Sequence, residues 1–152
     1  MKRGTRIYLD VCCLNRPFDN QEQQRVRMEA EAIKSILLLM GAGRCVAIGS
    51  DAIDFEIDRL ADPDRYLELM AISDDFAEHV RVGEAERRRG NELEALGLGP
   101  MDALHVACAE KAGADVVLTT DDALVKRARR CADLLTVRVV NPLVWLGEVL
   151  GK

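Results

Sequence analysis

Arg6-Ile-Tyr-Leu-Asp10 contains the apolar run Ile7–Leu9, which predicts a short buried strand that ends at an acid. Similar short apolar segments recur at residues 44–48, 79–82, 116–118 and 137–140. Between them, apolar residues spaced three and four apart predict amphipathic helices. Alternating strands and helices are typical of βα units. We therefore predict a three-layer α/β sandwich with a mostly parallel central sheet of four to five strands.

Local signals set the expected ends of the helices. Residues 15–20 are rich in turn-forming types and predict a loop. Asn20 with Gln23 predicts a capping box for a helix that runs to Met40. Ser50 is a good N-cap for a second helix, and Asp62 with Pro63 starts a third that runs to about residue 72. Later helices are expected at residues 84–96, 100–111, 122–131 and after Asn141-Pro142.

Composition bounds the protein class. The chain has 152 residues, of which 49% are hydrophobic and 31% charged, so one globular domain spanning residues 1–152 is expected. Only 4% are aromatic, which argues against a stacking platform for single-stranded nucleic acid. The net charge is −5, yet basic residues cluster at 87–89 and 126–130. These clusters are either local basic patches or solvated helix faces.

Cysteine usage and hydropathy suggest a cytoplasmic protein. The five cysteines are an odd number without a CxxC pair, so reduced thiols are expected rather than a disulfide framework or a zinc site. No signal peptide is visible at the N-terminus. The longest apolar run, Ile36–Met40, is far too short to cross a bilayer. We expect no membrane association.

Four carboxylates carry the functional signal, each placed where a strand ends or on a helix that follows one. They are Asp10, Glu56, Asp102 and Asp121. In an open parallel sheet such positions converge at the carboxyl ends of the strands. Four like charges need a cation, and a carboxylate site for a divalent metal is typical of phosphate chemistry. Taken singly, each acid also fits a turn, a helix cap or a solvated helix face.

The neighbours of these acids suggest supporting roles. His105 lies three residues after Asp102 on an otherwise apolar helix, so it is either near the site or a packed core histidine. Asp121 and Asp122 compete for one position. We favour Asp121 as the metal ligand and Asp122 as the helix cap or a supporting group. Thr119 and Thr120 could hydrogen-bond a ligand water or a phosphate oxygen.

With these motifs in view, the chain resembles a PIN-domain protein over nearly its whole length. The resemblance rests on Tyr8-Leu-Asp-Val-Cys-Cys-Leu-Asn-Arg-Pro-Phe18, which marks a standalone bacterial subset, and on three shorter motifs. These are Ser50-Asp-Ala-Ile-Asp-Phe-Glu-Ile57, Met101-Asp-Ala-Leu-His-Val-Ala107 and Val117-Leu-Thr-Thr-Asp121. PIN domains are metal-dependent ribonucleases, and many are VapC-type toxins of toxin–antitoxin pairs. The family's four acids match Asp10, Glu56, Asp102 and Asp121.

The resemblance implies hydrolysis of RNA phosphodiester bonds with one or two Mg²⁺ or Mn²⁺ ions. It also implies an antitoxin partner and a homodimer. Toxins usually carry a small hydroxyl residue or Asn two or three positions after the first acid, where this chain has Cys12-Cys13. Asn15, Arg16 and Thr120 are then the expected RNA contacts.

Two other function classes need residues that this chain lacks. A haloacid-dehalogenase-like phosphatase needs a second Asp where Cys12 stands, and a receiver domain needs a lysine that residues 137–141 lack. The alternative that stays open is a non-catalytic PIN-like module that binds RNA or protein. The apolar helices at 26–40 and 63–72 could serve a dimer or antitoxin interface, although burial in the core is the commoner explanation for such helices.

Overall fold

The central sheet has five parallel strands in the computed structural model, which describes residues 4–151. The strand order is β3-β2-β1-β4-β5, and every neighbouring pair is parallel. The bounds are β1 Thr5–Leu9, β2 Cys45–Ser50, β3 Glu78–Val80, β4 Val116–Leu118 and β5 Arg138–Val140. The predicted α/β class and parallel sheet are confirmed, with five strands.

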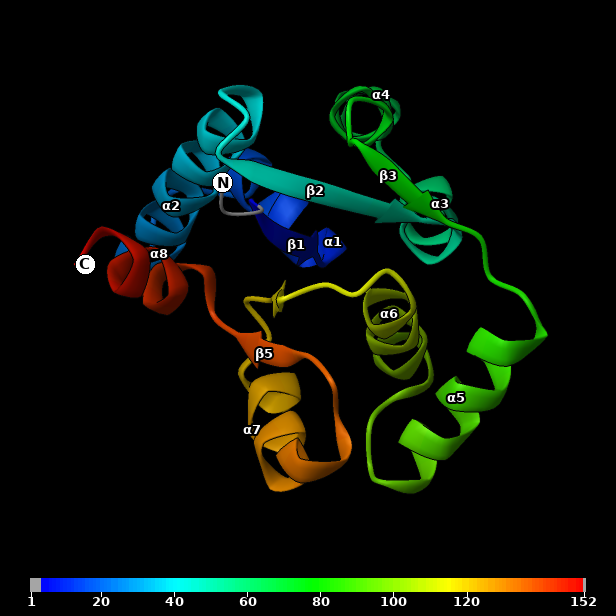
Figure 1. Ribbon diagram of the computed structural model, residues 1–152. Coiled ribbons are helices and arrows are strands. Elements are labelled where there is room, and N and C mark those ends of the chain that lie inside the picture. The colour runs from blue at the N-terminus through cyan, green and yellow to red at the C-terminus, as the bar shows by residue number, and fades with distance from the viewer. Residues whose placement is uncertain (1–3, 152) are drawn as a thin grey trace.

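Helices cover both faces of this sheet. They are α1 Val11–Asn15, α2 Gln24–Gly41, α3 Asp51–Asp58, α4 Pro63–Asp74, α5 Glu84–Ala95, α6 Pro100–Lys111, α7 Asp122–Arg130 and α8 Pro142–Leu150, with short 3₁₀ turns η1 Arg16–Phe18 and η2 Ala132–Leu134. Figure 1 shows α2 and α8 together on the left of the sheet, and α5 beside α6 on the right. These three layers bury the apolar strand residues from both sides.

The chain reverses its direction of travel across the sheet at β1. From the central strand β1, the chain adds β2 and β3 on one side, and later β4 and β5 on the other. The crevice of a doubly wound sheet forms at such a reversal, at the carboxyl ends of the strands. The backbone N–H of Asp10 donates to the carbonyl of Leu118 over 3.0 Å, which joins the ends of β1 and β4 at this point. The fold therefore supplies a site between these two strand ends.

The core surrounds the same strand ends. Ile7, Tyr8 and Leu9 of β1 are fully buried, as is Leu118 of β4. On α6 almost every residue from Ala103 to Ala109 is buried. Because α6 carries apolar residues around most of its circumference, it packs as an interior helix rather than as an amphipathic surface helix.

Several predicted helix ends are confirmed. The Ser50 hydroxyl accepts from the N–H of Ile53, and the Asp62 carboxylate accepts from the first turn of α4. Helix α6 has the predicted bounds, and Gly113 follows it with φ 67°, in the left-handed region that glycine enters at no steric cost.

The segment before α2 differs from the prediction. The predicted loop at residues 15–20 contains the 3₁₀ turn η1, and helix α1 precedes it where no helix is predicted. Pro17 fits because a proline suits the first turn of a helix. The predicted capping box at Asn20 is wrong. Gln23 is the N-cap residue, without a side-chain hydrogen bond, and the Asn20 side chain instead accepts from the N–H of Glu22 in a local turn.

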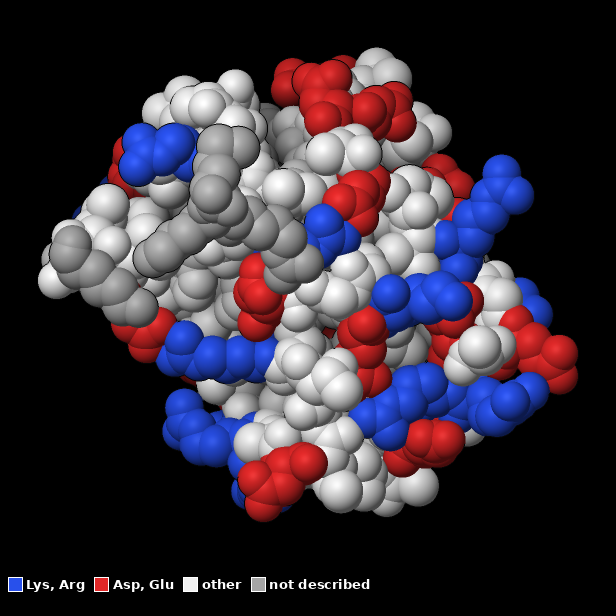
Figure 2. Space-filling model, viewed as in Figure 1, with Lys and Arg blue, Asp and Glu red and all other residues white. Residues whose placement is uncertain are grey.

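Charge is unevenly spread over the surface. In Figure 2 acidic side chains gather at the top over α4, and basic side chains lie over α5 at the lower right. Within residues 4–151, no helix is both long and apolar enough to cross a membrane.

Candidate metal centre

Asp10 lies at the centre of the crevice, directly after β1. Asp10 is only 6% exposed, and its Oδ2 accepts a hydrogen bond of 3.0 Å from the Thr119 hydroxyl at the end of β4. The Cys12 thiol lies 3.4 Å from the same oxygen and 3.3 Å from the Thr119 hydroxyl. Oδ2 is thus held by neighbours, while Oδ1 faces the next two site residues.

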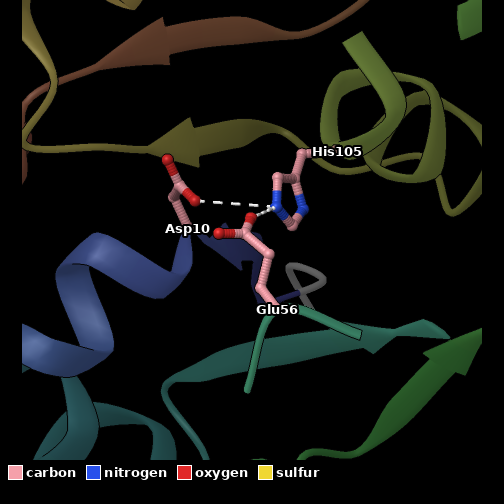
Figure 3. A group of neighbouring side chains, drawn as sticks. All are labelled: Asp10, Glu56 and His105. Atoms are coloured by element: carbon pink, nitrogen blue, oxygen red, sulfur yellow. Dashed lines mark hydrogen bonds and ion pairs between the residues drawn. The ribbon is translucent and has the colours of Figure 1, made fainter. Parts of the chain in front are cut away.

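Those two residues are Glu56 and His105. Glu56 projects from α3 and accepts a hydrogen bond from His105 Nε2 on α6. The same nitrogen is 3.7 Å from Asp10 Oδ1. Figure 3 shows the three side chains pointing toward one another from three different elements. One donor atom from each lies within 4.8 Å of the other two, a spacing that suits a shared cation.

A buried hydrogen-bond chain orients His105. Its Nδ1 is 2.6 Å from the Tyr8 hydroxyl, which is 2.7 Å from the Ser50 hydroxyl. Ser50 in turn caps α3, the helix that carries Glu56. Burial raises the pKa of Tyr8 well above its usual value, so the phenol stays protonated. His105 has a raised pKa because the hydrogen bond to Glu56 and the nearby acids outweigh its burial.

Asp102 completes the acidic group from the first turn of α6. Burial is the main cause that raises its pKa to about 6, with added contributions from the charges of Asp10 and Asp121 and a smaller one from Glu56. Asp102 is therefore close enough to the other three acids to be repelled by their charges. The helix N-terminus stabilises the ionised form of Asp102 only in part.

Asp121 reaches the crevice as the N-cap of α7. Its Oδ1 accepts from the N–H groups of Ala123 and Leu124 at 2.9 and 3.3 Å. The expectation that Asp122 caps this helix is therefore wrong. Asp122 is exposed and forms a two-pronged ion pair with Arg25 of α2, with N–O distances of 2.7 and 2.8 Å. Asp121 is the N-cap residue because an N-cap needs an extended backbone, and the backbone of Asp121 is extended, with φ −83° and ψ 103°.

These residues fit a divalent cation. Among residues 4–151, neither a lysine nor an arginine forms an ion pair with any of the four acids, and His105 is their basic neighbour. Carboxylate oxygens are the ligands that Mg²⁺ and Mn²⁺ prefer. A bound cation would remove the repulsion that raises the pKa of Asp102.

A family model for the PIN domain matches residues 7–130. The chain belongs to the PIN domain family. Its fold is similar to that of a chain in the crystal structure of VapBC2 from Rickettsia felis bound to a DNA fragment from their promoter. The TM-score is 0.59 at 14% identity, over 90% of this chain and 98% of that one. A comparison with curated proteins gave no match.

Asn15, Arg16 and Thr120 are the three predicted RNA contacts. In this PIN domain the side chains of Asn15 and Arg16 bind other residues of the protein itself. Arg16 forms ion pairs with Glu29 and Asp19, at 2.8 and 3.2 Å. The Asn15 side-chain carbonyl accepts from Arg65 of α4 over 3.2 Å. These contacts favour structural roles, in which the loop after α1 is tied to α2 and α4.

Thr120 was the third of these residues. It is buried, and its backbone N–H lies 3.4 Å from the Cys12 sulfur. Its neighbour Thr119 is the threonine that contacts an acid of the PIN domain centre, through the bond to Asp10. Cys12 therefore takes part in holding the loop after β4, although it brings no hydroxyl group.

Sequence reasoning missed Tyr8 and Ser50 as supports of the centre. Both hydroxyls are buried, and they lie 42 residues apart in the chain. One usable signal was present: each carries a hydroxyl group beside buried apolar residues of its strand, and such groups need a partner. The partners themselves come from other elements and become visible only in the fold.

Proposed function

We propose that this PIN domain is a metal-dependent ribonuclease that hydrolyses RNA phosphodiester bonds. The observation that supports this most is the convergence of Asp10, Glu56, Asp102 and Asp121 on one crevice without a lysine or arginine to pair them within the described residues. Such a group is costly unless a cation balances it. Divalent metals in carboxylate sites chiefly serve phosphate chemistry.

The residues have separable tasks in this proposal. Asp10, Glu56, Asp102 and Asp121 would hold one or two Mg²⁺ or Mn²⁺ ions. When bound, such an ion activates water and offsets charge on the phosphate. Thr119 fixes one oxygen of Asp10, and His105 holds the Glu56 carboxylate toward the crevice. Capping of α7 fixes Asp121 through Oδ1.

Exposed basic residues next to the crevice would bind the RNA backbone. Helix α7 starts directly after Asp121, and four of its exposed residues are Lys126, Arg127, Arg129 and Arg130. The helix is about 13 Å long at 1.5 Å per residue, so its basic end is within a few nucleotides of the acids. Contacts to phosphates position RNA without reading its sequence.

The proposal includes a protein partner, as in a toxin–antitoxin pair, and self-association. The structural neighbour belongs to VapBC2 from Rickettsia felis, which was crystallised bound to a DNA fragment from their promoter. A groove of about 280 Å³ lies between the C-terminal ends of α2 and α4, lined by Leu37, Met40, Ile72 and Phe76 among others. It offers apolar area to an antitoxin or a second copy of the chain. With RNA as substrate, the proposed location is the cytoplasm.

The test is cleavage of mixed end-labelled RNAs by the purified chain with Mn²⁺, Mg²⁺ or EDTA. The Asp102→Asn variant removes one acid of the centre, and Asp58→Asn removes an exposed acid of α3 as its matched control. We expect metal-dependent cleavage by the wild type and by Asp58→Asn, and a loss of at least about 100-fold in Asp102→Asn.

Cleavage that survives EDTA, or that Asp102→Asn retains, would contradict the proposal. Absence of cleavage by metal-loaded wild-type protein on all RNAs would favour a PIN-like module that binds RNA or protein without cutting.

A further inference from the structure

His105 occupies a position that packing alone does not explain. Its side chain is 1% exposed, in the middle of the buried stretch of α6, yet its Nε2 points at two carboxylates. A polar ring in such an apolar helix is costly unless both nitrogens have partners. The direction of Nε2 into the acidic crevice makes His105 more than a core residue.

The opposite nitrogen is held by a support of the kind that metal-bound histidines have. Nδ1 meets the Tyr8 hydroxyl, and the Tyr8 hydroxyl meets the Ser50 hydroxyl, with all three side chains buried. In metal sites, a hydrogen bond at one ring nitrogen fixes the tautomer and orients the other nitrogen toward the ion. The Tyr8–Ser50 pair can hold the ring in that way here: Nδ1–H would donate to the Tyr8 hydroxyl, and Nε2 would give up the proton that it shares with Glu56 to solvent when the cation takes its place.

We infer that His105 Nε2 is a direct nitrogen ligand of the cation bound by Asp10 and Glu56. This inference rests on the proposed function, because it concerns the same metal centre. It changes the ligand set from oxygen alone to mixed nitrogen and oxygen. Imidazole suits transition metals better than Mg²⁺, so the centre selects Mn²⁺ over Mg²⁺.

The distances are compatible with this ligand set. His105 Nε2 and Asp10 Oδ1 are 3.7 Å apart, and one donor atom of Glu56 lies within 4.8 Å of both, so small side-chain adjustments would bring all three to one ion. Glu56 now hydrogen-bonds the same nitrogen, and its side chain is 32% exposed, so it has room to open toward the crevice.

The test uses the fact that the chain has only two histidines. Untagged protein loaded with one equivalent of Mn²⁺ is measured by electron spin echo envelope modulation, which detects nitrogen bound to the ion. His79 on β3 is exposed, and His79→Gln is the matched control for His105→Gln. We expect directly bound histidine nitrogen in the wild type and in His79→Gln, and none in His105→Gln.

Affinity gives a second readout that does not depend on catalysis. By calorimetry, His105→Gln should weaken Mn²⁺ binding about 10–100-fold and Mg²⁺ binding less, whereas His79→Gln should leave both within about twofold. Tyr8→Phe keeps the buried shape and removes the partner of Nδ1, so it should weaken Mn²⁺ binding by a smaller factor. The wild-type and His79→Gln spectra decide the assignment even where His105→Gln folds poorly.

Each contrary outcome is distinct. Stoichiometric Mn²⁺ without histidine nitrogen, together with metal-dependent RNA cleavage, would overturn this inference and keep the proposed function. A nitrogen signal lost in His79→Gln would place the ion at the exposed histidine and overturn the inference as well. Failure of the wild type to bind Mn²⁺ at all would overturn both.

Discussion

Two groups of one histidine and two acids differ in what surrounds them. Asp10, Glu56 and His105 meet in the crevice, and Asp51, Asp54 and His79 meet at the ends of β2 and β3. In the second group, His79 Nε2 is 2.7 Å from Asp51 Oδ1 and 3.8 Å from Asp54 Oδ2. Residue types and spacing alone do not separate the two groups.

Burial and neighbours do separate them. The His79 side chain is 44% exposed and the His105 side chain only 1%. We call Asp51, Asp54 and His79 the outer group and Asp10, Glu56 and His105 the inner group. Water can hydrogen-bond much of the outer group. Asp51 also accepts from the N–H of Val82, which together with His79 lowers its pKa. The inner group faces the further charge of Asp102 and is held from behind by Tyr8. In the outer group the pKa of Asp54 is also raised, chiefly by burial and then by nearby acids, but His79 opposes that rise. The inner group is the more deeply buried of the two and is therefore the one in which a cation should relieve more repulsion.

The largest expected difference between the groups is in stabilisation by metal. Mn²⁺ at 100 times its dissociation constant should stabilise the folded chain by about 2.7 kcal/mol. This corresponds to a rise in melting temperature of about 5–10 °C for a chain of this size. Asp10→Asn should abolish the rise, and Asp51→Asn should keep it. Thermal unfolding by circular dichroism, with and without Mn²⁺, measures both, and a rise that Asp51→Asn loses would reverse the comparison.

Without metal, a smaller effect on stability is expected: loss of the Asp102 charge should stabilise the folded chain. The Asp102 pKa of about 6 exceeds the ~3.9 of an unfolded Asp, so its ionisation destabilises the fold. This loss is absent below about pH 4, grows as pH rises through 6 and is complete above it. Asp102→Asn should therefore raise the free energy of unfolding by about 1–2 kcal/mol above pH 7, after allowance for solvent screening.

Urea unfolding in EDTA between pH 5 and pH 8 measures this gain, which should shrink as the pH falls. A variant that is less stable than the wild type at pH 8 would contradict the raised pKa of Asp102.

The smallest effect on stability is expected in the outer group, where loss of the Asp51 charge should destabilise the folded chain. The pKa of Asp51 is lowered by its hydrogen bonds, so the ionised carboxylate stabilises the fold above its unfolded pKa, and this contribution is lost as pH falls. Asp51→Asn should cost less than about 1 kcal/mol at pH 7, because the pair is exposed. The same urea series measures it, and a gain in stability would make the outer group resemble the inner one.

Much of the fold could be predicted because its signals are local. Helix α6 begins at Pro100 and β4 ends at Leu118, as the apolar run, the proline and the following polar residues indicate. Helix α1 was missed because Cys12-Cys13-Leu14-Asn15 has no helical period of its own. Its backbone is set by burial of Val11, Cys13 and Leu14 against the sheet and α2.

The candidate site also has a part that could be predicted from the sequence and a part that could not. The four acids could be predicted from their positions at the ends of strands and the starts of helices. Their partners could not, since the Tyr8–His105 bond spans 97 residues and the Arg25–Asp122 pair also spans 97. Arg16 was assigned to RNA for this reason: its true partner, the fully buried Glu29, lies on α2 and carries no local sign of the pairing.

The central place of β1 in the sheet has a consequence for when the protein becomes functional during its synthesis. Asp10 emerges from the ribosome early, but Thr119, which holds it, follows 109 residues later. Strand β1 also lacks one of its two neighbours until β4 has been made. A nascent chain therefore cannot assemble the complete centre until about four-fifths of it has been translated. Up to that point the Asp10 carboxylate lacks the hydroxyl group that holds it.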